Sequence, residues 1–386
     1  MLRFLWRHKK KLLVASCVAS AAYAAYKTIP WEDLLINAIL PSTNQAQHDQ
    51  EEEKKKEHFL STQKEARAVL KRDLEKIKNR LLQLLDINLV RRQMTDKNQQ
   101  LEPRQWEKLK VLAFSQSLAA VYVAALLLVR IKLHLNIVAR HFLDELSTHH
   151  DPDQVLSRDA KLRFVSTDAL CGDGIQPLVQ VVQQAVKSRL SHLALDSDLT
   201  VNELSAALAT VREELEGGAG GPMPPAHALL GELVASEAAG ARVYSDMRES
   251  ADNFDFDTAS TEQHAKLLDE VSELIATDEY HHALSALFDC GFAHLERQLV
   301  RIYEVDTRKI MSKENGSENG NGVGGEGKAT YSHRLPVAKL VPKVLRTMHS
   351  ILDSDIEKNE AAQNMLACAA LDDLSWMAFT ASGLEV

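Results

Sequence analysis

Apolar residues recur at intervals of three and four along most of the chain, a spacing typical of amphipathic helices. The clearest stripe lies in segment 48–94 and consists of Leu70, Leu74, Ile77, Leu81, Leu84 and Leu85. The pattern predicts one long helix there and further helices over 175–190, 199–216, 226–249, 261–275, 280–303, 337–352 and 355–379. No run of alternating β-branched residues indicates a sheet, so the predicted fold class is all-α.

Segment 106–143 differs because its middle is apolar all round. From Leu118 to Val129 the residues are uncharged and mostly apolar, and Arg130 ends the run. The run is too short to cross a bilayer comfortably, since a spanning helix needs about 20 apolar residues. We therefore predict a central helix buried on most sides, with Pro103 at its start.

Local signals mark the ends of several other helices. Asp173 is a plausible N-cap for the helix over 175–190, and Pro177 suits its first turn. Gly217 is expected to end the helix over 199–216. Residues 312–330 are rich in Gly and Asn and are predicted to form a disordered loop.

The N-terminal residues combine a basic cluster with an apolar run. The predicted membrane-targeting cluster comprises Arg7, His8, Lys9, Lys10 and Lys11. The run from Leu12 to Tyr26 follows, and its anchoring side chains would be Leu12, Leu13, Val14, Val18, Tyr23 and Tyr26. At about 1.5 Å per residue this helix would span roughly 22 Å, against a hydrocarbon core of ~30 Å. Flanking lysines and tryptophans can compensate for the difference.

The residues alone leave more than one interpretation of this segment open. A secretory signal peptide has the same basic and apolar regions, and Ala22-Tyr23-Ala24 resembles a cleavage site. A mitochondrial presequence would be rich in Arg and Ser and amphipathic, which this segment is not. A permanent anchor gives two predicted parts: a targeting and anchor segment, 1–30, and a helical domain, 31–386.

Charge separates the N-terminus from the rest of the chain. The net charge is −9. Arg3, Arg7, Lys9, Lys10 and Lys11 contribute +5, so the remainder carries −14. Such an acidic body is a poor nucleic-acid binder, whereas the basic N-terminus suits a membrane surface.

No pattern in the sequence demands an enzyme. Cys17, Cys171, Cys290 and Cys368 are far apart and form no CxxC pair. The neighbouring histidines His149-His150 and His281-His282 would point about 100° apart on a helix, so neither pair is expected to chelate a metal. Neither HExxH nor GxSxG occurs. We expect no cofactor, no metal and no small-molecule substrate.

Four stretches in order along the chain resemble the peroxin-3 family. They are WRHKKK before the apolar run (6–11), the central segment 106–137, GDGIQPLVQVVQQAV (172–186) and LPVAKLVPKVLRTMHSI (335–351). The resemblance implies an elongated multi-helix bundle on a single N-terminal membrane anchor. It also implies a non-enzymatic docking receptor in the peroxisomal membrane, with the large domain in the cytosol.

The resemblance also implies a partner and a binding site. In the family, an amphipathic helix of the peroxin-19 chaperone lies in a hydrophobic groove. Trp106 matches the family's tryptophan in that groove and Lys339 matches a lysine at its border, while Leu101 is a weaker match. From the residues alone, Trp106 is either a core residue or an exposed anchor; the resemblance favours the anchor.

Two expectations stand against this interpretation. The positive-inside rule would leave residues 1–11 in the cytosol and the large domain across the membrane, opposite to the family's arrangement. The alternative function is a helical tether or scaffold anchored at another organelle, without a chaperone-binding groove.

Overall fold

The computed structural model describes residues 44–95, 103–147, 155–217, 234, 258–314 and 333–381. The chain divides into two compact units, Met1–Glu57 and His58–Val386. Of the first unit only 44–57 are described, and the predicted targeting segment, anchor and boundary at residue 30 lie outside the described residues. The following account concerns the second unit.

The described residues are almost entirely helical, which confirms the all-α fold class. Two strands of two residues each, β1 (Asp198–Leu199) and β2 (Leu335–Pro336), pair antiparallel. The sequence pattern did not predict this pairing, since two residues are too short to show any alternation. The pairing connects the start of α8 (Val201–Glu216) to the start of α14 (Val337–Ile351).

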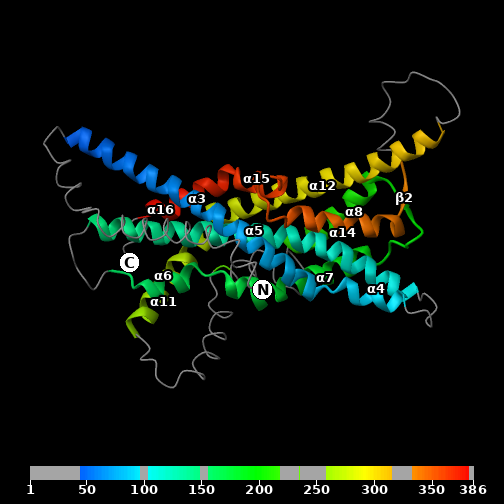
Figure 1. The fold of residues 1–386 in the computed structure, drawn as a ribbon, viewed down its shortest axis with the longest axis horizontal. Helices are drawn as coiled ribbons and strands as arrows, with labels where there is room; N and C mark the ends of the chain where they lie inside the picture. The colour runs from blue at the N-terminus through cyan, green and yellow to red at the C-terminus, as the bar shows by residue number, and fades with distance from the viewer. Residues whose placement is uncertain are drawn as a thin grey trace, which may run out of the picture. The chain divides into compact units, whose positions relative to one another are not determined.

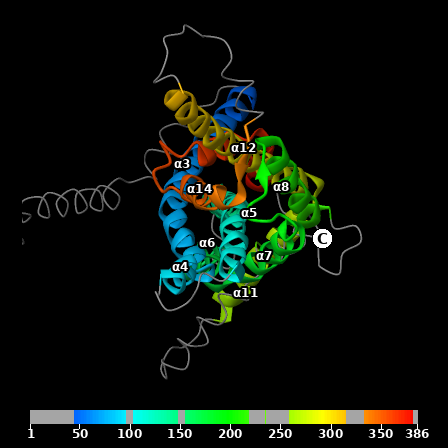
Figure 2. The same ribbon diagram turned by 90° about the vertical axis from the view of Figure 1, so that its right-hand side faces the viewer.

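Helix α5 (Pro103–Ser147) is the centre of the fold, as predicted. Every residue from Leu118 to Val129 is at most 4% exposed. Figure 2 shows α5 with other helices on all sides of it. Among the described helices only α5 is long and apolar enough to cross a membrane, but 94% of its apolar stretch is buried within the fold. It is therefore the core helix of this domain.

From His58 onward, helix α3 (Asn44–Leu84) runs antiparallel to α5 (Figure 1). Gln63 Nε2 donates to Asn136 Oδ1 (3.2 Å), and Gln116 Nε2 donates to the carbonyl of Leu85 (2.8 Å). The predicted stripe is confirmed, because all its members except the partly buried Leu84 are at most 2% exposed.

The predicted single helix over 48–94 is nevertheless two helices. It breaks before α4 (Ile87–Thr95), where the Asp86 carboxylate accepts a bond from the backbone N–H of Leu89 (2.9 Å). A side chain that accepts a hydrogen bond from a backbone N–H at the start of a helix caps that helix, so the chain can begin a new helix in another direction. The apolar spacing continues across the break, so periodicity could not reveal it.

The segment after α5 contains two elements that the pattern did not indicate. Helix α6 (Arg158–Val165) is capped by Ser157, and a π-helical turn, η1 (Leu170–Gly174), follows. Helix α7 (Gln176–Leu190) has Pro177 in its first turn, as predicted. The predicted cap role of Asp173 is wrong: its carboxylate forms an ion pair with Arg80 instead.

The next helices largely match the predicted spans. Helix α8 (Val201–Glu216) begins with a reciprocal capping box between Thr200 and Glu203 and is capped at its end by Gly217. Helix α11 (Thr258–Ile275) is followed by α12 (Asp278–Glu314). Because α12 continues to Glu314, the first residues of the predicted loop 312–330 are helical. The predicted helix over 226–249 lies outside the described residues apart from Val234.

The last predicted helix is also divided in two. Helix α14 (Val337–Ile351) matches its prediction, but 355–379 contains α15 (Glu360–Leu366) and α16 (Ala369–Thr380). Asn359 accepts a bond from the N–H of Ala362 and so sets the start of α15. A short non-helical junction at Cys368 separates α15 from α16.

Candidate functional site

The N-terminal ends of α5 and α14 lie side by side. Ser117 of α5 donates a hydrogen bond to the carbonyl of Val344 (2.8 Å), and Thr347 donates to Ser117 Oγ (2.8 Å). Both helices run in the same direction in Figure 1, so both begin toward the same end of the bundle. Their first turns contain Trp106 and Lys339, which are far apart in the sequence.

A loop over 191–198 joins the two helix starts. The ammonium of Lys110 in α5 donates to the carbonyl of Leu193 (2.5 Å). The backbone N–H of Ala338 in α14 donates to the carbonyl of Leu195 (2.9 Å), and that of Val337 to Ser197 (3.1 Å). The loop therefore fixes the spacing between the turn with Trp106 and the turn with Lys339.

Trp106 is partly exposed and packs with its covered part against the core. Leu193 and Leu195 of the loop are also partly buried against the core. A half-covered indole presents apolar surface together with an N–H donor, a combination common at binding surfaces. The arrangement offers an apolar surface at one end of the bundle.

Exposed cations occur in the first two turns of the same two helices. Arg104 and Lys108 of α5 and Lys339 of α14 are exposed, and none forms an ion pair with another described residue. Lys110 is different, because its side chain is fully buried and its ammonium lies 2.6 Å from Glu107. The buried lysine holds the local structure together, whereas the three exposed cations can meet an acidic partner.

The other predicted site residues lie outside the described residues. These are Leu101 and the targeting and anchor side chains Arg7, His8, Lys9, Lys10, Lys11, Leu12, Leu13, Val14, Val18, Tyr23 and Tyr26. Sequence reasoning missed Lys110 and the loop over 191–198. A lysine within an apolar helix gives no sign of the carbonyl that it will bind, and the loop carries no motif.

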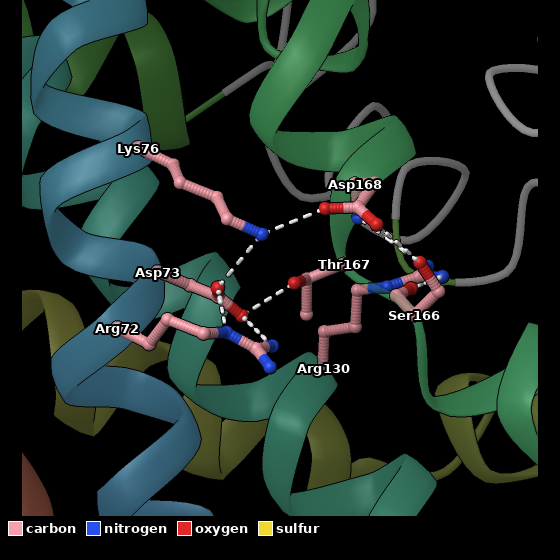
Figure 3. A network of polar contacts seen from close by, with 7 residues as sticks. All are labelled: Arg72, Asp73, Lys76, Arg130, Ser166, Thr167 and Asp168. Carbon is pink, nitrogen blue, oxygen red and sulfur yellow. Dashed lines mark hydrogen bonds and ion pairs between the residues drawn. The ribbon is translucent and has the colours of Figure 1, made fainter. Parts of the chain in front are cut away.

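A second polar cluster lies between α3 and the residues before η1 (Figure 3). The fully buried carboxylate of Asp73 accepts hydrogen bonds from Arg72 (2.7 and 2.9 Å) and from Thr167. Lys76 lies 3.3 Å from Asp73 and 2.7 Å from Asp168. Burial alone would raise the pKa of Asp73, but the hydrogen bonds from Arg72 and Thr167 hold it below its usual value.

This cluster joins three segments of the fold. Arg130 of α5 donates to the carbonyls of Val234 (2.9 Å) and Ser166 (3.2 Å), next to Thr167. Burial raises the pKa of the nearby Cys171 thiol to about 11. Among the described residues, no three His, Cys, Asp or Glu side chains are placed to hold a metal ion. The mutual pairing of these charges is typical of a structural network.

Fold and geometry together define an all-α protein whose candidate site is a partly apolar, partly basic surface suited to a macromolecular partner. Comparison with known proteins identifies its family. The family model described as Peroxin-3 matches residues 170–381, more than half of the chain, and the chain belongs to that family.

Curated relatives extend the similarity over most of the chain. Peroxisomal biogenesis factor 3 of Mus musculus is 24% identical over 362 residues, which cover 91% of this chain and 90% of the relative. Its Homo sapiens counterpart is also 24% identical, over 367 residues. Peroxisome biogenesis protein 3-1 of Arabidopsis thaliana is 23% identical over 385 residues, 94% of each chain. These relatives support a role in peroxisome biogenesis for this chain, as a protein of the peroxisomal membrane.

Proposed function

We propose that this protein is a docking receptor in the peroxisomal membrane that captures the peroxin-19 chaperone through a short amphipathic helix. The half-buried Trp106, at the end shared by α5 and α14, is the observation that carries the proposal. Membership of the Peroxin-3 family supports the peroxisomal setting. A tether at another organelle has no support in the names of these relatives.

The binding step uses the apolar surface first. An amphipathic helix presents large side chains at intervals of three and four, and such anchors bind apolar surface between neighbouring helices. Trp106 supplies that surface, and the partly buried leucines of the loop over 191–198 border the same helix starts. A tryptophan in this role contributes about 2 kcal/mol, which is roughly 30-fold in affinity.

The exposed cations act on the approach of the partner. Arg104 and Lys108 lie in the first two turns of α5 and Lys339 in the first turn of α14, although the chain as a whole is acidic. They attract an acidic helix and orient it, which mainly raises the association rate. The overall negative charge disfavours acidic partners elsewhere on the surface. Cargo carried by the chaperone is thereby delivered close to the bilayer.

The membrane end of the mechanism rests on the N-terminal sequence. The basic cluster 7–11 targets the protein and contacts lipid headgroups, and the run 12–26 is its single anchor. The large helical domain faces the cytosol, where the chaperone is available. In intact peroxisomes, added protease is expected to digest a C-terminal tag; a protected tag would overturn this orientation.

A titration tests the binding step. The full-length protein in detergent is titrated with a fluorescent peptide that contains the amphipathic helix of the same organism's peroxin-19. We expect saturable 1:1 binding that weakens at high salt. A scrambled peptide of the same composition controls for nonspecific charge attraction. Failure of the native sequence to bind more tightly than the scrambled one would refute the receptor function.

A further inference from the structure

Lys110 is a fully buried cation one turn beyond Trp106 in α5. Its ammonium lies 2.6 Å from a carboxylate oxygen of Glu107 and donates to the carbonyl of Leu193 at 2.5 Å. Residues four apart in a helix share one face, so Lys110 lies on the face that carries Trp106. Side chains of a helix point back toward its N-terminus, which brings the ammonium toward the turn of Trp106. The carbonyl of Leu193 is therefore held beside that turn.

The same loop is held to the start of α14 by backbone contacts. Leu195 and Ser197 accept hydrogen bonds from the first two residues of α14, and β1 pairs with β2 directly before that helix. Arg334 also donates to the carbonyl of Asp198 (2.9 Å). These contacts fix the loop relative to α14, whereas Lys110 holds it to α5. Because the contact to α5 comes from a side chain, a substitution can remove it.

A buried ammonium restricts its surroundings more than an apolar side chain does. The ammonium loses its hydration on burial, so it needs both of its acceptors at hydrogen-bond distance. An apolar side chain of similar length needs no acceptor, and such replacements often leave stability unchanged or higher. Lys110 therefore contributes to the position of the loop more than to the stability of the fold.

We propose that Lys110 is a positioning residue for the partner surface, which holds the loop over 191–198 against the Trp106 turn in the arrangement that receives the amphipathic helix. The inference rests on the proposed function, and it concerns a residue that the partner does not touch, since the Lys110 side chain is 0% exposed. Without this bridge the loop is free to move relative to α5, and the partner must order it on binding. That ordering costs free energy and lowers the affinity.

Lys110→Met in the full-length protein removes both contacts of the ammonium and keeps an unbranched apolar side chain. Lys132→Met is the matched control, because Lys132 is also a buried lysine of α5 and pairs with one carboxylate, that of Asp372. In both variants the remaining carboxylate keeps its access to water. We expect the affinity for the peroxin-19 peptide to fall about five- to tenfold in Lys110→Met and less than about twofold in Lys132→Met.

Urea unfolding and hydrogen–deuterium exchange distinguish positioning from a loss of folding. The urea midpoints of the two variants should shift by similar amounts, whereas only Lys110→Met should speed amide exchange over 191–198 in the free protein. If Lys110→Met binds as tightly as the parent protein, or loses affinity only in proportion to its unfolded fraction, the positioning role is wrong. If the parent protein itself binds no more tightly to the peptide than to the scrambled control, the receptor function fails, and Lys110 has no partner surface to position.

Glu107→Ala tests the bridge from its other end and decides the question if Lys110→Met does not fold. The Glu107 side chain is 43% exposed, so its truncation creates no buried cavity. Through charge attraction alone, removal of this negative charge should strengthen binding of an acidic partner. Loss of the carboxylate that pairs with the buried ammonium should instead free the loop and weaken binding about threefold. Binding that is tighter than in the parent protein, or equal to it, would contradict the proposal.

Discussion

The cations near the two ends of α5 differ in burial and in ion pairing. Near the C-terminal end, Lys132 and Arg140 are buried, and each has a carboxylate partner: Lys132 lies 2.8 Å from Asp372, and Arg140 pairs with Glu270. Arg140 also donates to the carbonyl of Ala381 (2.6 Å). Near the N-terminal end, Arg104 and Lys108 are exposed and have no ion-pair partner among the described residues.

The difference distinguishes charges that are paired within the fold from charges that remain exposed to solvent. A buried cation loses its hydration, so it must be matched by carboxylates and carbonyls of the same fold. An exposed cation keeps its hydration and can exchange it for a partner's carboxylate. The buried cations near the C-terminal end of α5 are therefore matched within the fold, whereas Arg104 and Lys108 near the N-terminal end have no ion-pair partner among the described residues.

The tryptophans extend the same comparison. Trp376, which is 37% exposed, packs edge-on against Phe59 with ring centroids 5.1 Å apart and lies beside Phe379. Phe379 in turn stacks on His58, which also stacks on Phe142 near the C-terminal end of α5. Residues 106 and 142 of one helix are roughly 50 Å apart. Trp376 is thus a matched control for Trp106, an accessible indole at the opposite end.

The largest effect is expected from breaking a buried ion pair. Glu270→Ala leaves Arg140, whose side chain is 9% exposed, without its carboxylate, and should lower the free energy of unfolding by about 3 kcal/mol. Lys108→Ala at the other end should change it by less than about 0.5 kcal/mol. Urea unfolding followed by circular dichroism measures both. Equal losses would remove the distinction between the two ends.

Removal of the indole at the N-terminal end should affect binding. We expect Trp106→Ala to weaken binding of the peroxin-19 helix at least tenfold, or by at least about 1.4 kcal/mol, since an anchoring indole is lost. Trp376→Ala should change affinity less than about twofold. Fluorescence anisotropy with the labelled peptide measures both. Unchanged affinity in Trp106→Ala would reject the assigned anchor.

Acid should weaken the buried C-terminal half of α5. Burial, followed by the charge of Arg130, holds the pKa of His134 well below 6.5, so the folded protein keeps this residue neutral. The unfolded chain binds the proton below pH 6.5, and stability therefore falls as the pH decreases. His134 should cost about 1 kcal/mol between pH 7 and 5.5. His134→Gln should flatten this part of the profile; an unchanged slope would assign it to other groups.

The smallest effect is expected at Lys339. Lys339→Ala should slow association of the peptide two- to fivefold and make binding less sensitive to salt, leaving dissociation nearly unchanged. Arg334→Ala is the matched control, because Arg334 is exposed but pairs with Glu203 (2.8 Å). Stopped-flow measurements at low and high salt separate the rates. An effect confined to dissociation would place Lys339 inside the contact rather than at its border.

Periodicity predicted the elements that bury a continuous apolar face. The stripe from Leu70 to Leu85 and the apolar run in α5 specify their helices locally, because each turn contributes to one buried surface. The breaks at Asp86 and Cys368 were missed, since helical spacing continues through both. Side-chain caps and close packing set these breaks, and neither changes the apolar spacing.

The residues of the candidate site were predicted from the sequence and stay a prediction, whereas the contacts that connect them were not predicted. Trp106 and Lys339 came from the resemblance to a family, while periodicity alone left Trp106 undecided between core and surface. The loop over 191–198 connects the two helix starts. It accepts backbone hydrogen bonds from Ala338 and Val337 and a side-chain hydrogen bond from the buried Lys110. Bonds between backbone groups so distant in sequence are independent of side-chain type and leave no pattern to detect.

Hydrogen–deuterium exchange of the full-length protein with and without peroxin-19 tests the central claim most directly. The account predicts slower exchange on binding at the start of α5, in the loop over 191–198 and at the start of α14. Peptides from α16 around Trp376 should exchange at the same rate in both states. Protection confined to α16, or no change at the N-terminal end of α5, would contradict a partner surface at Trp106.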